Sequence, residues 1–198
     1  EAKDQVYIRI TGLDTDNPDC FRCVVEDGHY EGEGRINMKN FVRYNPRMDI
    51  RAFSNHDGKP YLLLAEVIGQ DKDGKLNFNM RDLLSKFVYE NLDTGVMTQC
   101  VVLEEYRNMY LCISEYGYSV QVPIKPDMPR IPIGSYMEVC ISDIRSTGTV
   151  EGGYVQQILH NFTVQDAFAN LIDTYADDKV YEVEDEKEDI QQEVQLDE

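Results

Sequence analysis

The chain has 198 residues, an apolar share of 42% and a formal net charge of −18. The apolar share is enough to build a packed core, which excludes a wholly disordered protein. Such a charge does not favour long-range attraction to a polyanion such as nucleic acid. The charge is uneven, however: residues 1–88 carry 15 acidic and 13 basic side chains, whereas residues 163–198 carry 13 and 2.

The first 80 residues contain five short segments with the composition of β-strands. They are separated by turns rich in Gly, Asp and Asn, and they cover residues 6–10, 21–25, 35–42, 61–68 and 75–80. The last two segments flank Asp71-Lys72-Asp73-Gly74, where Gly74 supplies the positive φ that a tight hairpin turn requires. Five short strands with Gly-rich turns favour a small barrel over a sandwich.

The spacing of apolar residues becomes helical at residues 80–92, which predicts a connecting helix. A second set of five strand-like segments follows at residues 95–103, 109–115, 118–122, 136–145 and 149–157. The same architecture is therefore predicted twice. Thr163 and Asp166 then predict the capped start of a second helix. From residue 177 onward the acidic, thinly apolar sequence predicts a solvated tail.

Residues 6–84 resemble the S-one RNA-binding domain, a family of five-stranded oligonucleotide-binding (OB) barrels. The resemblance is carried by three segments: Gly32-Glu33-Gly34-Arg35-Ile36-Asn37, the apolar strand at 62–68, and the ending at 71–81. The histidine and serine usual in the first of these segments are Arg35 and Asn37 here. Residues 133–139 and 148–152 resemble the fourth strand and the closing hairpin of the same family more loosely.

The resemblance implies a mainly β protein with two small OB-type barrels joined by a helix. The expected boundaries are a first barrel at 1–84, a linker helix at 85–94, a second and divergent barrel at 95–160, a C-terminal helix at 161–177 and an acidic tail at 178–198.

Basic residues recur in the first module and are interleaved with Phe41 and Tyr44. Single-stranded nucleic acid is held by cations on its phosphates and by aromatic rings under its bases, and OB barrels bind on their second and third strands. The predicted stacking residues are Phe21, His29 and Tyr30, and the predicted phosphate contacts are Arg22, Arg35, Lys39 and Arg43. The alternative interpretation is a solvated surface on which these cations balance neighbouring carboxylates.

The sequence contains few signs of a metal site, a cofactor site or a catalytic site. Cys20-x-x-Cys23 near His29 is half of a zinc motif, and no second pair completes the four ligands. No known nucleotide-binding or hydrolase motif occurs, so we expect neither a cofactor nor an enzyme. Five cysteines, an odd number, favour a reducing cytoplasm over a disulfide framework. No apolar run approaches the ~20 residues of a membrane helix.

The sequence therefore predicts a cytoplasmic, non-catalytic binding module, or a fragment of one. Its predicted ligand is single-stranded RNA, or single-stranded DNA in its place, bound through the first barrel. The rival hypothesis is a protein-interaction scaffold whose acidic second barrel and tail dock on a basic protein partner.

Overall fold

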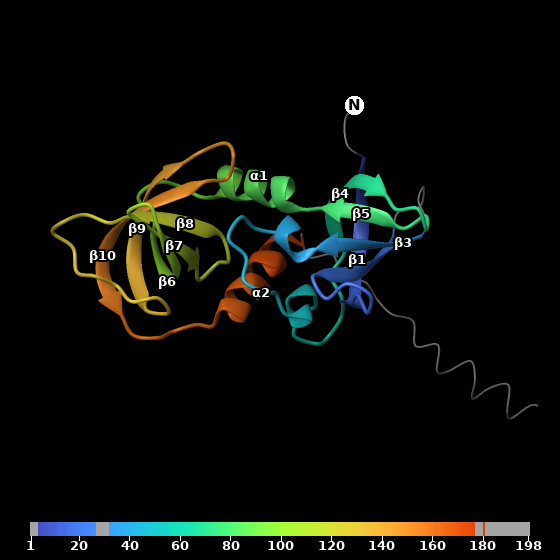
Figure 1. Ribbon diagram of the computed structural model, residues 1–198, viewed down its shortest axis with the longest axis horizontal. Helices are drawn as coiled ribbons and strands as arrows, with labels where there is room; N and C mark the ends of the chain where they lie inside the picture. Colours follow the sequence, from blue (N-terminus) through green and yellow to red (C-terminus); the bar gives the residue numbers. More distant parts are fainter. Residues whose placement is uncertain (1–3, 27–31, 177–179, 181–198) are drawn as a thin grey trace, which may run out of the picture.

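The molecule is elongated, with a β-barrel at each end and two helices between them (Figure 1). The computed structural model describes residues 4–26, 32–176 and 180. Within these residues, no helix is long and apolar enough to cross a membrane. The predicted acidic tail, apart from Val180, lies outside the described residues.

The N-terminal barrel, called barrel one, has five strands: β1 (Gln5–Leu13), β2 (Cys20–Val25), β3 (Glu33–Asn37), β4 (Leu63–Gln70) and β5 (Leu76–Asn79). They close in the order β1-β2-β3-β5-β4. All neighbouring pairs are antiparallel except β3 with β5, which run parallel. The side chains that alternate inward, such as Ile8, Phe21 and Phe78, are fully buried and fill the barrel.

The C-terminal barrel, called barrel two, repeats this connectivity with β6 (Met97–Tyr106), β7 (Met109–Ser114), β8 (Ser119–Pro123), β9 (Tyr136–Ile144) and β10 (Val150–Ile158). It closes in the order β10-β8-β7-β6-β9, and β8 with β10 is again the parallel pair. Both closed barrels are consistent with the predicted OB type, a five-stranded barrel that buries its inward side chains.

Helix α1 (Arg81–Asn91) follows barrel one directly, and its buried face carries Leu84 and Val88 at i, i+4 spacing. Helix α2 (Val164–Tyr175) follows barrel two and begins with a capping box between Thr163 and Asp166. Its buried residues belong to one core cluster that runs through both barrels. The elements predicted from sequence are therefore present, with boundaries that differ by a few residues.

Helix α2 fixes barrel two to barrel one. Gln165 Oε1 accepts a hydrogen bond from the Asp49 backbone N–H at 2.8 Å, and Tyr175 donates its hydroxyl to the Leu64 carbonyl at 2.7 Å. On the other side, Gly117 in the turn after β7 packs so closely on α2 that an added Cβ would lie 2.5 Å from the Ala167 carbonyl oxygen. The helix is therefore part of the contact between the two barrels.

One predicted strand is shorter than expected. The segment predicted at 35–42 leaves the sheet after Asn37, whose side-chain oxygen caps a 3₁₀ turn, η1 (Met38–Asn40). A second 3₁₀ segment, η2 (Ile50–Phe53), follows before β4. An Asn side chain that accepts its neighbours' backbone N–H groups competes with the sheet, which explains the early end of the strand.

Candidate nucleic-acid interface

The outward faces of β3 and β5 carry polar side chains side by side. Arg35 on β3 is the parallel partner of Asn77 on β5, and each strand continues with an asparagine, Asn37 and Asn79, on the same face. Arg22 on β2 is the partner of Arg35, and Lys39 lies in the 3₁₀ turn that follows β3. We call this set the polar strip: Arg22, Arg35, Asn37, Lys39, Asn77 and Asn79.

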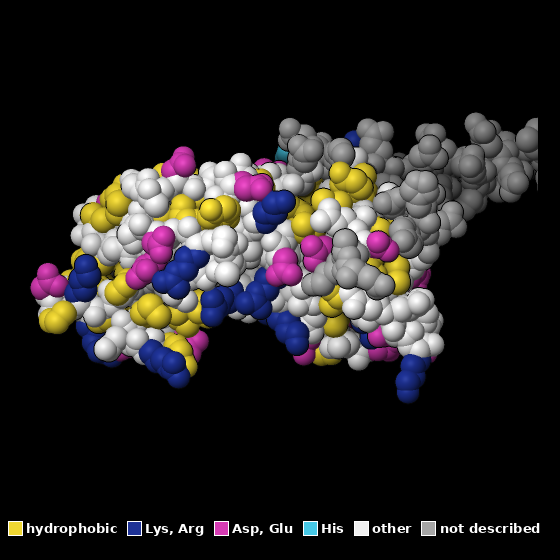
Figure 2. Space-filling model, turned by 90° about the horizontal axis from the view of Figure 1, so that it is seen from above, with side chains coloured by type: hydrophobic (Ala, Val, Ile, Leu, Met, Phe, Trp, Pro, Cys, Tyr) yellow, Lys and Arg dark blue, Asp and Glu magenta, His cyan; other side chains and the backbone are white. Residues whose placement is uncertain are grey.

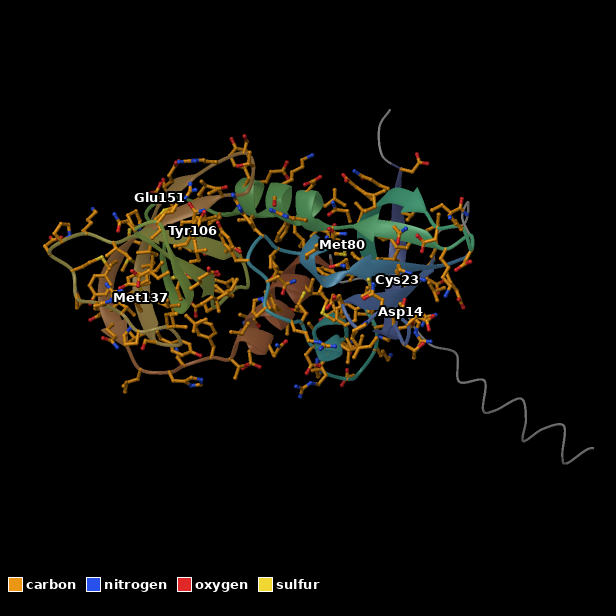
Figure 3. All side chains as sticks on the ribbon, in the orientation of Figure 1. Asp14, Cys23, Met80, Tyr106, Met137 and Glu151 are labelled. Atoms are coloured by element: carbon orange, nitrogen blue, oxygen red, sulfur yellow. The ribbon has the colours of Figure 1, made fainter. Side chains whose placement is uncertain are left out.

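The polar strip runs along barrel one toward barrel two. Arg35 contacts Asp14 at one end, and Asn79 precedes Met80 at the other. Figure 3 shows Asp14 farther from barrel two than Met80. A bound strand of nucleic acid that followed the strip would therefore be led toward the contact between the barrels.

Carboxylates neutralise the outer end of the strip. Arg22 and Arg35 are directly opposite each other on β2 and β3. The Arg35 guanidinium lies 3.5 Å from carboxylate oxygens of both Asp14 and Asp71. Asp14 is 6% exposed, and hydrogen bonding from the Asp16 N–H, with the charge of Arg35 nearby, lowers the pKa of its carboxyl group. Arg35 is thus paired with two protein carboxylates, which a phosphate would have to displace, and its role as a phosphate contact stays a prediction.

The other three predicted phosphate contacts remain accessible. Arg22, Lys39 and Arg43 are all exposed. Arg22 lies over Gly12, where an added Cβ would be 3.6 Å from its Nη2 atom. Arg43 lies beyond the strip, in the connection between the two 3₁₀ segments, and its Nη1 donates to Thr149 Oγ1 of barrel two at 3.2 Å. The structure therefore places Arg22 on the outer face of β2, Lys39 in the 3₁₀ turn that follows β3, and Arg43 at the contact with barrel two.

The stacking role predicted for Phe21 is wrong. Its side chain is fully buried and forms edge contacts with Phe41 and Phe53, at centroid distances of 6.2 and 5.0 Å. Because alternate residues of a strand point to opposite sides, exposure of Arg22 on β2 requires Phe21 to face the core. His29 and Tyr30, the other two predicted stacking residues, lie outside the described residues.

The two cysteines of the half zinc motif do not converge. Cys23 points into the core of barrel one, where burial raises the pKa of its thiol, and Cys20, three residues earlier on the same strand, lies on the opposite side. Within the part of the chain that the structure describes, no three His, Cys, Asp or Glu side chains are grouped as a metal site would require.

In barrel two, the outer face of β7 and β8 corresponds to the face of β2 and β3 in barrel one, and it is covered by other parts of the chain. Leu111 and Ile113 on β7 are cross-strand partners of Gln121 and Ser119 on β8, so the four side chains share the outer face. Leu111 and Ile113 are 4% and 0% exposed. Tyr44 of barrel one donates its backbone N–H to Ser119 Oγ at 3.3 Å and accepts a hydrogen bond from Gln121 Nε2 at 2.9 Å.

Sequence reasoning missed the asparagines on β5 and the arginine after them. Asn77 and Asn79 occupy alternate positions of the segment at 75–80 already predicted as a strand, and Arg81 begins α1. The alternation is the signal that assigns the two asparagines to one outward face. Their position beside β3 comes from the parallel pairing of β3 with β5, which joins segments about 40 residues apart.

Comparison with known proteins gives only matches of low similarity. No family model and no curated protein matches the sequence. Among solved structures, a multidomain protein with nucleic acid binding domains from Streptococcus pneumoniae is 10% identical, with a TM-score of 0.29, over 81% of this chain and 54% of its own. A Drosophila Unr fragment, CSD456, is 12% identical, with a TM-score of 0.27, over 78% of this chain and 63% of its own. The chain thus spans less than two thirds of either structure.

Proposed function

We propose that this chain binds single-stranded nucleic acid, RNA in particular, through the polar strip of barrel one, and that it acts as a binding module without catalysis. The observation that carries the proposal is the open row of cations and amides on β2, β3 and β5. Arginine, lysine and asparagine side chains are donors to phosphate and sugar oxygens, and the outer face of strands 2 and 3 is the surface on which OB barrels bind oligonucleotides.

None of the six residues of the polar strip is aromatic. Contacts to phosphate and sugar position a strand without reading its bases. We therefore expect binding with little sequence preference and with a strong dependence on salt. The S-one family resemblance remains part of this proposal, with asparagine and arginine in place of the serine and histidine of the family pattern.

The test is fluorescence polarisation with the full chain and a labelled mixed-sequence single-stranded RNA, titrated between low and physiological salt. The variant Arg22→Ala/Lys39→Ala removes two cations from the strip. The matched control, Arg107→Ala/Lys125→Ala, removes two exposed cations from barrel two. We expect the strip variant to bind at least about tenfold more weakly, with the slope of log K against log salt shallower by about 1.4, and the control to change little.

Equal losses in the two variants would show that net charge rather than the strip governs binding. An absence of RNA binding even at low salt would reject the proposed function and would favour the protein-interaction scaffold instead. A parallel titration with single-stranded DNA separates RNA preference from general single-strand binding, because only RNA offers a 2′-hydroxyl to the asparagines.

A further inference from the structure

A pocket of about 310 Å³ lies where the two barrels meet, and we call it the junction pocket. Its polar lining comes from four separate parts of the chain: Asn40 and Arg43 after β3, Asn79, Arg81, Asp82 and Ser85 around the start of α1, Ser119 on β8, and Thr147 and Thr149 in the turn between β9 and β10. Its volume is at the lower end of the range of ~300–1,000 Å³ for small-ligand sites. Figure 2 shows basic side chains gathered at the notch between the two barrels.

Two arginines from different elements line this pocket. Arg43 has a fixed orientation, because it donates to Thr149 Oγ1 and lies 5.5 Å from the centroid of the Tyr44 ring. Arg81 is half-buried, and its guanidinium makes no hydrogen bond or ion pair to any described residue. A guanidinium has five N–H donors and no acceptor, so Arg81 retains its full donor capacity toward a ligand.

The hydroxyl groups of the pocket also favour an anion. Ser119 Oγ already accepts the Tyr44 N–H, and Thr149 Oγ1 already accepts from Arg43. A hydroxyl whose oxygen accepts one hydrogen bond still has a proton to donate. The Thr147 and Thr149 hydroxyls are 3.4 Å apart, so one of them donates to the other and one proton of the pair is left for a ligand. Among the described residues that line the pocket, Asp82 is the one carboxylate. The lining therefore offers two positive charges and several donors against one negative charge, which matches a group with several anionic oxygens.

The turn between β9 and β10 of barrel two packs against helix α1 at the edge of the pocket. Gly148 lies between Thr147 and Thr149 with φ of +83°, and an added Cβ would lie 2.4 Å from Ser85 Cβ on α1. Only glycine allows both this conformation and this approach. The threonine hydroxyls are thereby held beside the start of α1.

We propose that the junction pocket is a phosphate-binding site. The identity of the phosphate rests on the proposed function: it is a backbone phosphate of a single strand that leaves the polar strip and crosses onto barrel two. Asn79 belongs both to the strip and to the pocket lining, so the two surfaces are continuous. Barrel two, although acidic, then contributes hydroxyl donors to the same ligand.

The test uses the full chain with two probes, the labelled single-stranded RNA and inorganic pyrophosphate. Arg43→Gln/Arg81→Gln removes the two cations, and Arg107→Gln/Lys125→Gln is the control with the same change of charge. Thr149→Val removes one donor of barrel two and keeps the shape of the side chain. Urea unfolding of each variant checks that the fold is retained, and Arg81→Lys supplies a variant that keeps the charge.

We expect the double arginine variant to bind RNA about a hundredfold more weakly, about tenfold for each charged contact. We expect the slope of log K against log salt to become shallower by about 1.4, pyrophosphate to compete with RNA, and Thr149→Val to lose severalfold in affinity. A variant that loses pyrophosphate binding but keeps RNA affinity would support a site for a free phosphate compound and overturn the backbone assignment. If the double arginine variant keeps both its pyrophosphate binding and its RNA affinity, the phosphate site is overturned.

The two proposals fail separately. If the wild-type chain binds no RNA but binds pyrophosphate in a manner that depends on Arg43 and Arg81, the phosphate site stands and the proposed function is rejected. If RNA binding depends on Arg22 and Lys39 but not on Arg43 and Arg81, the proposed function stands and the phosphate site is rejected.

Discussion

Barrel one and barrel two have the same strand order and the same parallel closing pair, yet their corresponding faces differ. On barrel one, β2 exposes Arg22 beside Arg35. On barrel two, the matching strand β7 buries Leu111 and Ile113, and Tyr44 of barrel one lies against its neighbour β8. One copy of the fold therefore keeps this face open, and the other uses it to hold the molecule together.

The difference shows that topology alone does not place a binding site. The apolar outer side of β7 is stabilised by contact with the rest of the chain, since apolar area removed from water contributes roughly 25 cal/mol per Å². The polar outer side of β3 and β5 gains nothing from such burial and stays at the surface. The three predictions that follow test this contrast, beginning with the largest expected effect.

Phe21→Ala tests whether the aromatic residues of barrel one belong to its core rather than to its open face. We expect the variant to lose about 3–5 kcal/mol of unfolding free energy, because it leaves a cavity between Phe41 and Phe53. Urea unfolding measures this loss. Phe21→Leu keeps most of the apolar volume and should lose less than about 1.5 kcal/mol.

RNA affinity separates the two roles of Phe21. If the ring is only a core residue, Phe21→Leu binds RNA as the wild type does. A large loss of affinity in this stable variant would restore the stacking role and would weaken the contrast between an open polar face and an aromatic core.

Gly117→Ala tests the covered side of barrel two. Gly117 has φ of +85°, and its added Cβ would lie 2.5 Å from the Ala167 carbonyl oxygen and 2.7 Å from Leu171 Cβ, both on α2. We expect a loss of about 2–4 kcal/mol from backbone strain and displacement of the helix. Gly134→Ala is the matched control, because φ there is +87° and no atom lies within 4 Å of the added Cβ. Its loss should be only the strain of about 1–2 kcal/mol. Equal losses in thermal or urea unfolding would mean that α2 does not hold barrel two firmly.

Much of the fold could be predicted because it depends on local patterns. The alternation in the strands, the Asp71–Gly74 turn and the Thr163 cap with Asp166 are each visible within a few residues. The repeat of five strands then predicted two similar barrels. The early end of β3 was missed, since it depends on the side chain of Asn37 accepting a backbone N–H.

The site was harder to predict, since its residues meet through long-range pairing. Asp14 and Asp71 reach Arg35 from two different turns, and neither contact is visible from spacing along the chain. The placement of Phe21 was predictable in principle, because Arg22 next to it cannot share its side of the strand. Tyr44 and α2 cover β7 and β8. This contact could not be predicted from sequence, because it depends on how the two barrels are placed relative to each other.

Asp14→Asn has the smallest expected effect and tests how carboxylates hold the open face in place. The substitution keeps an oxygen that can accept the Asp16 N–H but removes the charge opposite Arg35. We expect a loss of about 1 kcal/mol at pH 7, since the asparagine keeps the hydrogen bond from Asp16 and Arg35 keeps Asp71 as a partner. Asp73→Asn, in the exposed turn before β5, makes the same charge change and should alter stability by less than about 0.5 kcal/mol.

The pH dependence of this loss identifies its cause. Because folding lowers the pKa of the Asp14 carboxyl, its charge stabilises the folded state above the unfolded pKa of about 3.9. That stabilisation is lost as the pH falls through the lower, folded-state pKa. Urea unfolding at pH 7, 5, 4 and 3 should therefore show the gap between wild type and Asp14→Asn constant at first and narrowing below about pH 4. A gap that is the same at every pH would mean that the charge of Asp14 does not hold Arg35. Asp71 would then be the remaining carboxylate that pairs with Arg35 on the open face of barrel one.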